Sequence, residues 1–114
     1  MLTLATSNEV KIYKNQDVKR IIAFIPPSHR HVRLYIEFTD QKIVIQQATI
    51  DAIIRAYISV ALHPQRKAIE LIRRRLSRNE RKESFAEYQL IETLKKEEGI
   101  MCELDKLLGV SSHD

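Results

Sequence analysis

Polar and apolar residues alternate strictly along one stretch in the first half of the chain. Residues 32–39 read VRLYIEFT, so every second side chain is apolar. Successive side chains of a β-strand point to opposite faces, and the pattern therefore predicts a half-buried strand with one apolar and one polar face. Asp40 and Gln41 supply a turn, and the β-branched residues 42–47 continue as the second strand of a hairpin.

Other segments of the first half also have strand character. Residues 19–25 read KRIIAFI and are ended by two prolines, which cannot donate a hydrogen bond to a neighbouring strand. Residues 9–14 alternate more weakly, and residues 2–6 provide material for one further strand beside them. We expect four to five strands in an antiparallel β-meander over residues 1–47.

The repeat of apolar positions changes to that of a helix in the second half. Thr49 is a suitable N-cap, and apolar side chains recur every three or four positions through residues 49–62. We expect this helix to lie across the apolar face of the sheet, at the centre of the core. A second helix is expected over residues 65–78, because Pro64 suits the first turn of a helix.

Two more helices are expected towards the C-terminus. Ser84 begins a capping-box sequence, and an apolar stripe at helical spacing follows it as far as Gly99. A short helix over residues 101–108 is closed by Gly109, a residue type common just past helix ends. Residues 110–114 are expected to be a frayed tail.

These elements predict a single α+β domain over residues 1–114. Residues 1–47 form the meander, and residues 48–109 form three to four helices that cover one face of it.

The composition is that of a folded intracellular domain. The chain has 114 residues, of which 44% are apolar and 30% charged, and this length suits one domain. Charged residues interrupt every apolar run before the ~18 residues that a membrane span needs, and no secretion signal is recognisable. We therefore expect a cytoplasmic protein that does not bind membranes.

Few residues are suited to catalysis or to cofactor binding. Cys102 is the single cysteine, which excludes an intrachain disulfide framework and a multi-thiolate zinc site. Gly99 and Gly109 are the only glycines, so no glycine-rich phosphate loop can form. We expect no cofactor and favour a non-enzymatic function.

Positive charge is concentrated in the middle of the chain. Residues 48–81 hold eight basic and three acidic side chains, whereas residues 82–114 hold four basic and eight acidic ones. Guanidinium groups match phosphate oxygens, so a basic helix here predicts binding to the backbone of DNA or RNA with little sequence specificity. The candidate contacts are Arg66, Lys67, Arg73, Arg74, Arg75, Arg78 and Arg81. Alternatively, these side chains pair with the glutamate-rich segment 83–98 of their own chain.

The apolar residues of the C-terminal helices suggest a second hypothesis, a homodimeric protein-interaction or adaptor domain. Small domains often complete a core by dimerising, and these helices carry many apolar groups for a short chain to bury alone. Ordinary packing onto the helix at residues 49–62 is the alternative. The residues concerned are Phe85, Tyr88, Ile91, Leu94, Ile100, Met101, Leu104, Leu107 and Leu108.

A third hypothesis is a metal-dependent nuclease that uses His29 and His31. In an extended segment the two imidazoles lie on the same side, a spacing that can hold a metal ion. The pair is similar to the histidine–hydrophobic–histidine motif of rolling-circle replication and relaxase nucleases, which implies a tyrosine nucleophile on a helix, here Tyr57 or Tyr88. The middle position is Arg30 rather than a hydrophobic residue, and Tyr57 is expected to be buried.

Overall fold

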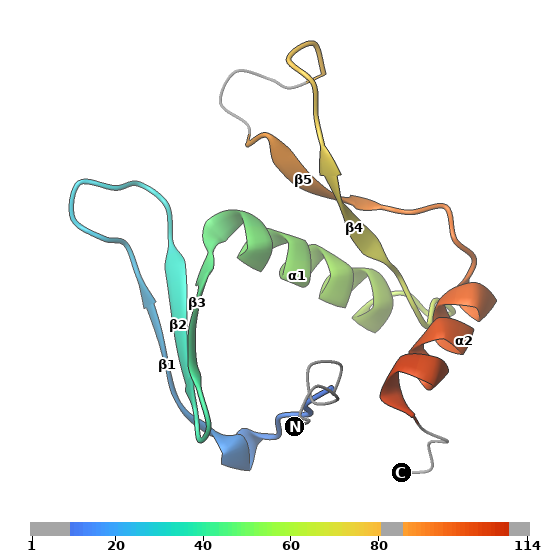
Figure 1. The fold of residues 1–114 in the computed structure, drawn as a ribbon, viewed down its shortest axis with the longest axis horizontal. Coiled ribbons are helices and arrows are strands. Elements are labelled where there is room, and N and C mark those ends of the chain that lie inside the picture. The colour runs from blue at the N-terminus through green and yellow to red at the C-terminus, as the bar shows by residue number, and fades with distance from the viewer. Residues whose placement is uncertain (1–9, 81–85, 110–114) are drawn as a thin grey trace, which may run out of the picture. The chain divides into compact units, whose positions relative to one another are not determined.

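The computed structural model describes residues 10–80 and 86–109 (Figure 1). It is α+β, with five strands in two small sheets and two α-helices among these residues. They fall into two compact units, one formed by residues 10–47 and 104–109, the other by residues 48–80 and 86–103. In chain order the elements are the 3-10 helix η2 (Asn15–Asp17), β1 (Val18–Phe24), β2 (Arg33–Phe38), β3 (Lys42–Gln46), α1 (Gln47–Ala61), β4 (Leu71–Arg75), β5 (Tyr88–Glu92) and α2 (Glu97–Leu108).

The first unit contains a three-stranded antiparallel meander in the order β1-β2-β3. Its register sets Ile21, Ile36 and Ile43 side by side on one face. Leu34 lies on the same face, with Ala23 and Ile45 beside it, so this face is apolar as the alternation of residues 32–39 predicted.

The opposite face of the meander carries a polar cluster. The Nε of Arg20 donates to Oε1 of Glu37 at 2.8 Å, and the Tyr35 hydroxyl donates to the same oxygen at 3.2 Å. The guanidinium of Arg20 also lies 5.6 Å from the centre of the Tyr35 ring. The hydrogen bond from Arg20 holds the pKa of Glu37 below its usual value.

The segment before η2 packs on the turn between β2 and β3. The rings of Tyr13 and Phe38 are stacked with centroids 3.9 Å apart, and the Tyr13 hydroxyl donates to Asp40 at 2.9 Å. Residues 10–14 have no regular secondary structure, so the strand predicted over residues 9–14 is wrong for the described part. The further strand predicted at residues 2–6 lies outside the described residues.

Helix α1 agrees with the helix predicted over residues 49–62, although it begins two residues earlier. Helix α2 includes the short helix predicted over residues 101–108 and begins at Glu97. Gly109 closes it with a φ of 65° and donates its N–H to the carbonyl of Asp105 at 3.0 Å. The left-handed conformation explains why glycine occupies this position.

The prediction of a four-to-five-stranded meander covered by three to four helices is wrong. Residues 65–78 and 86–96 do not form the predicted helices, and they supply β4 and β5 of a two-stranded antiparallel hairpin. Leu71 lies off the helical stripe of apolar residues, whereas a strand places Leu71 and Ile72 on opposite faces and pairs both. Pairing with a second strand therefore outweighs a weak local helical preference.

A polar network connects the base of the hairpin to α2. The Thr93 hydroxyl donates to Glu70 at 2.9 Å, and the Lys95 ammonium donates to Glu70 at 3.2 Å and to Glu103 at 2.6 Å. The hydrogen bond from Thr93, assisted by Lys95, lowers the pKa of Glu70. The hydrogen bond from Lys95 to Glu103 raises the pKa of Lys95 most, and the hydrogen bond to Glu70 raises it further.

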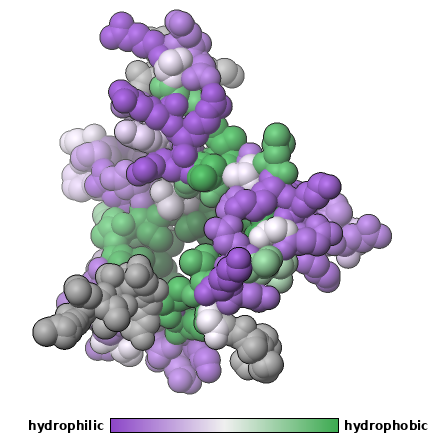
Figure 2. Space-filling model, turned by 45° about the vertical axis from the view of Figure 1, so that its right-hand side comes forward, coloured by the Kyte–Doolittle hydropathy of each residue, from purple (hydrophilic) through white to green (hydrophobic). Residues whose placement is uncertain are grey.

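The described residues bury very little apolar surface. Only Ala52, Ala68 and Ile100 are buried among them, and two of these three side chains are single methyl groups. Nineteen large apolar side chains are exposed, and apolar residues are visible on the surface in Figure 2. Isoleucine and leucine are among the residues most often buried in folded proteins, so this balance is unusual.

The contrast between two side chains of α2 tests where the small core lies. Ile100 is 8% exposed and Leu107 is 59% exposed. We predict that Ile100→Ala lowers the free energy of unfolding by about 2 kcal/mol or more, because it leaves a cavity. Leu107→Ala is expected to cost less than about 1 kcal/mol. Urea denaturation at one fixed chain concentration measures both, and equal losses would contradict the described burial.

Candidate nucleic-acid interface and exposed apolar surface

The predicted basic residues lie on a hairpin instead of a helix. In β4, Arg73 and Arg75 point to one face and Arg74 to the other, because side chains alternate along a strand. Arg75 is paired in register with Tyr88 of β5, and Arg74 with Gln89. The three consecutive arginines therefore do not form the single cationic side that the helical prediction required.

Three of the candidate guanidinium groups pair with carboxylates of the same chain. Arg66 pairs with Glu92, and Arg75 pairs with Glu87. Both carboxylates belong to the segment 83–98, which was the alternative partner in the sequence analysis. The third pair joins Arg74 to Glu80 at 2.6 Å.

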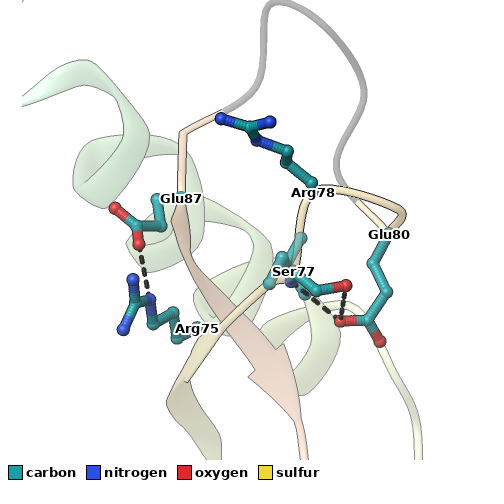
Figure 3. Close-up of a pocket in the computed structure, with 6 residues that line it drawn as sticks. Arg75, Ser77, Arg78, Glu80 and Glu87 are labelled. Carbon is teal, nitrogen blue, oxygen red and sulfur yellow. Dashed lines mark hydrogen bonds and ion pairs between the residues drawn. The ribbon is translucent and has the colours of Figure 1, made fainter.

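The carboxylate of Glu80 also closes the turn at the end of β4. Its Oε1 accepts the backbone N–H of Ser77 at 3.0 Å and the Ser77 hydroxyl at 3.2 Å (Figure 3). The bond from the Ser77 backbone N–H is one of the two hydrogen bonds of a capping box, but here the backbone N–H of Glu80 donates to the Ser77 carbonyl instead of the Ser77 hydroxyl and closes a turn. The hydrogen bond from the Ser77 backbone lowers the pKa of Glu80 most, and the hydrogen bond from the Ser77 side chain lowers it further.

A pocket lies beside this turn and has mixed charge. Its charged lining residues are Arg75, Arg78, Glu80 and Glu87, and Leu76 and Ser77 complete the lining. Two cations and two carboxylates face it, so the pocket offers no net charge to a phosphate group. In Figure 3 the Arg78 side chain extends away from Glu80, and no ion pair joins Arg78 to any described residue.

Arg73 and Lys67 have partners of other kinds. The guanidinium of Arg73 lies 5.7 Å from the centre of the Tyr88 ring, which is an exposed cation–π contact. The backbone N–H of Lys67 donates to Glu97 at 2.6 Å, whereas its ammonium forms no ion pair within the described residues. Arg81 lies outside the described residues.

The two histidines of the nuclease hypothesis lie in the connection between β1 and β2. His29 has its Nδ1 2.9 Å from the carbonyl of Pro27, and Ser28 between them has a φ of 66°. No cluster of three or more potential metal ligands occurs in the described part of the chain. Tyr57, expected to be buried, is 70% exposed on α1.

Eleven of the nineteen exposed large apolar side chains lie on the two helices and on β1. On α2 they include Met101, Leu104, Leu107 and Leu108, all of which the homodimer hypothesis named. On α1 they are Ile53, Ile54, Tyr57 and Ile58, which the sequence analysis had assigned to the centre of the core. On β1 they are Ile21, Ile22 and Phe24.

The apolar surface of α1 was missed because its apolar stripe was read as a buried face. Periodicity locates an apolar stripe on a helix but does not show which element covers it. The only sequence signal was the presence of Ala52 and Ala56 on the opposite side, where small side chains permit close packing.

Comparisons with known proteins add no assignment. The chain matches no family model, no curated protein and no solved structure. In the described residues, neither α-helix has the length and hydropathy needed to span a bilayer.

The turn at the end of β4 gives a pH-dependent prediction. The lowered pKa of Glu80 means that its carboxylate stabilises the turn above pH 4.5, the ordinary value, and that this stabilisation is lost as the pH falls through the lowered pKa. Ser77→Ala removes the hydroxyl donor and keeps the backbone donor, so the pKa should rise part of the way. Carbon-detected NMR titration of the Glu80 carboxyl measures the shift. Asn79→Ala is the control, and equal pKa values in the two variants would contradict the assignment.

Proposed function

We propose that this protein is a non-enzymatic assembly module that completes its hydrophobic core by associating with a second copy of itself. The observation that carries the proposal is that the described residues bury three apolar side chains, two of them alanines, and leave nineteen large apolar side chains exposed. Soluble monomers seldom leave so much apolar surface in water, and extensive patches of this kind are typical of protein interfaces.

The free energy available from burying these side chains is large enough to favour association. Full burial of a large apolar side chain is worth about 1.5–3 kcal/mol, so a half-exposed one gives up roughly 1 kcal/mol. Summed over even six such side chains, the gain is comparable with the net stability of a small domain. Proteins most commonly bury such a surface in a two-fold dimer, whose interface is self-complementary. In an obligate dimer of this kind, folding and association are a single equilibrium.

The mass in solution tests this function. We predict a particle of twice the 13.3 kDa chain mass at micromolar concentration, measured by light scattering coupled to size-exclusion chromatography. Added salt should not dissociate it, because its formation depends on apolar burial rather than on charge. A particle of 13.3 kDa at every concentration up to the millimolar range would overturn the proposal.

Nucleic-acid binding by the hairpin is a second candidate function. The observation in its favour is that Arg73 and Arg78 form no ion pair with a described residue, and that Arg73 lies over the exposed ring of Tyr88. Guanidinium groups can contact phosphates while an exposed ring offers a stacking surface. The paired Arg66 and Arg75 are also accessible, since an exposed ion pair contributes only about 0–1 kcal/mol and can exchange partners.

Salt dependence distinguishes the free arginines from the paired ones. For any binding to duplex DNA or single-stranded RNA, Arg73→Ala with Arg78→Ala should flatten the slope of log affinity against log salt by about 2. Arg66→Ala with Arg75→Ala removes the same charge but should flatten it less, because Glu92 and Glu87 already neutralise these groups. Fluorescence anisotropy measures the slopes. Absence of binding at low salt would end this second candidate.

A further inference from the structure

The two edges of the β4–β5 hairpin differ, and the edge of β4 is open. Leu76 donates its backbone N–H to the Glu87 carbonyl at 2.8 Å, which makes these residues a hydrogen-bonded pair of the antiparallel ladder. Hydrogen-bonded and non-hydrogen-bonded pairs alternate along such a ladder. Leu71, Arg73 and Arg75 therefore direct their backbone N–H and C=O groups away from β5. Within the described residues no hydrogen bond is made to these groups.

The outer edge of β5 confirms this alternation. The guanidinium of Arg55 on α1 donates to the Leu90 carbonyl at 3.4 Å, so this carbonyl points away from β4. Leu90 is the cross-strand partner of Arg73, and both members of a non-hydrogen-bonded pair direct their backbone groups outward. A side chain of the same unit thus reaches the edge of β5, whereas none of the described residues bonds to the edge of β4.

The side chains of β4 give its open edge a positive charge. Four of the five are exposed, and three of these four are consecutive arginines. Arg74 pairs with Glu80, and Arg75 pairs with Glu87. Arg73, at the centre of the strand, makes a cation–π contact but forms no ion pair with a described residue. A carboxylate opposite Arg73 would therefore complete the charge pairing of the strand.

We propose that β4 binds an extended acidic segment of a partner protein, which adds to the open edge as a third strand. In this binding mode the main-chain hydrogen bonds supply affinity, and alternate side chains supply specificity. The added strand is antiparallel, because parallel pairing is slightly less stable per residue. From its N-terminus it then lies opposite residues 75 to 71, with carboxylates opposite the three arginines and apolar side chains opposite Ile72 and Leu71. This inference goes beyond the proposed assembly function and does not depend on it.

The charges of this chain disfavour its own segments as the added strand. Residues 10–47 hold seven basic and three acidic side chains, and Asp17, Glu37 and Asp40 each accept a hydrogen bond from within that range. A second copy of β4, in the register that pairs all three open residues, would set Arg73 directly opposite its own symmetry mate. Like charges in that position destabilise a sheet. The occupant is therefore a segment of different sequence.

The backbone of the open edge favours a peptide over a nucleic acid. Each open residue offers an acceptor as well as a donor, at the two-residue repeat of a strand. A peptide strand carries both kinds of group at the same spacing, whereas phosphate oxygens only accept hydrogen bonds. A nucleic acid would leave the β4 carbonyls to water.

Peptides methylated at a backbone nitrogen test the added strand. The probe is the end-capped peptide Thr-Glu-Glu-Glu-Val-Val-Thr, whose third glutamate lies opposite Arg73. Methylation of the nitrogen of this glutamate removes a donor that points to the Arg73 carbonyl, and should weaken binding about ten-fold or more. Methylation at the second glutamate, whose N–H points away from β4, keeps the charge and should change the affinity by less than about three-fold. Isothermal titration calorimetry with the full chain measures both.

These methylated peptides also distinguish a strand from a simple anion. Equal losses of affinity would show that charge alone attracts the peptide, which overturns the strand addition and leaves nucleic-acid binding as a candidate. Absence of binding by the unmethylated peptide at millimolar concentration would also overturn the inference.

An exchange of charges tests the register. Arg73→Glu should weaken binding of the glutamate peptide about ten-fold, and a lysine in place of the third glutamate should restore binding to this variant. Arg78→Glu is the matched control, because it makes the same change at another arginine without an ion pair to a described residue, in the turn beyond β4. It should change the preference between the two peptides by less than about three-fold. An equal change of preference in both variants would overturn the inference.

Hydrogen exchange locates the bound strand and shows whether the edge is open beforehand. In the free protein the N–H groups of Leu71, Arg73 and Arg75 should exchange rapidly, and the peptide should slow their exchange about ten-fold or more. Ile21 and Ala23 are the control, because their N–H groups point to the outer edge of β1 and should not change. Slow exchange at β4 in the free protein would mean that another segment already covers this edge. That result, or protection of β1 in place of β4, would overturn the inference.

Discussion

Burial of apolar surface is the constraint on which the rest of this structure depends. The hydrophobic effect is the dominant favourable contribution to folding, and here the described residues place Ala52, Ala68 and Ile100 in the interior while large aliphatic groups remain in water. Ion pairs at the surface cannot substitute for it, because each contributes little against the entropy of ordering two long side chains. In the proposed dimer a second copy supplies the missing apolar contacts, so that the stability of this chain and its association would have one physical origin.

The basic residues have a local role that follows from the strand geometry. Side chains alternate along β4, so Arg74 pairs with Glu80 at the turn and Arg75 pairs with Glu87. These two positive charges are therefore neutralised within the hairpin and do not lie on one face. Arg74 and Arg75 remain exposed, and Arg73 and Arg78 form no ion pair with a described residue. The hairpin thus neutralises part of its positive charge internally, and the polyanion site proposed on it is the secondary candidate.

The sequence predicted those elements whose local pattern has a single structural meaning. Alternation over residues 32–39 identified β2 and its apolar face, and Gly109 marked the left-handed end of α2. The sequence pattern did not predict features that depend on contacts between residues far apart in the chain. The carboxylates that pair with Arg66 and Arg75 follow from the β4–β5 register, and the outward face of α1 follows from which side packs. Neither is encoded in the spacing of residues within one segment.

The dependence of unfolding on chain concentration tests the central claim most directly. If the apolar surface is covered only in an assembly, the urea midpoint must rise as the chain concentration is raised, because dissociation accompanies unfolding. For a two-state dimer, each ten-fold increase in concentration should add about 1.4 kcal/mol to the apparent stability. A midpoint that stays constant over a hundred-fold range of concentration would show that one chain buries its own core, and would contradict the account.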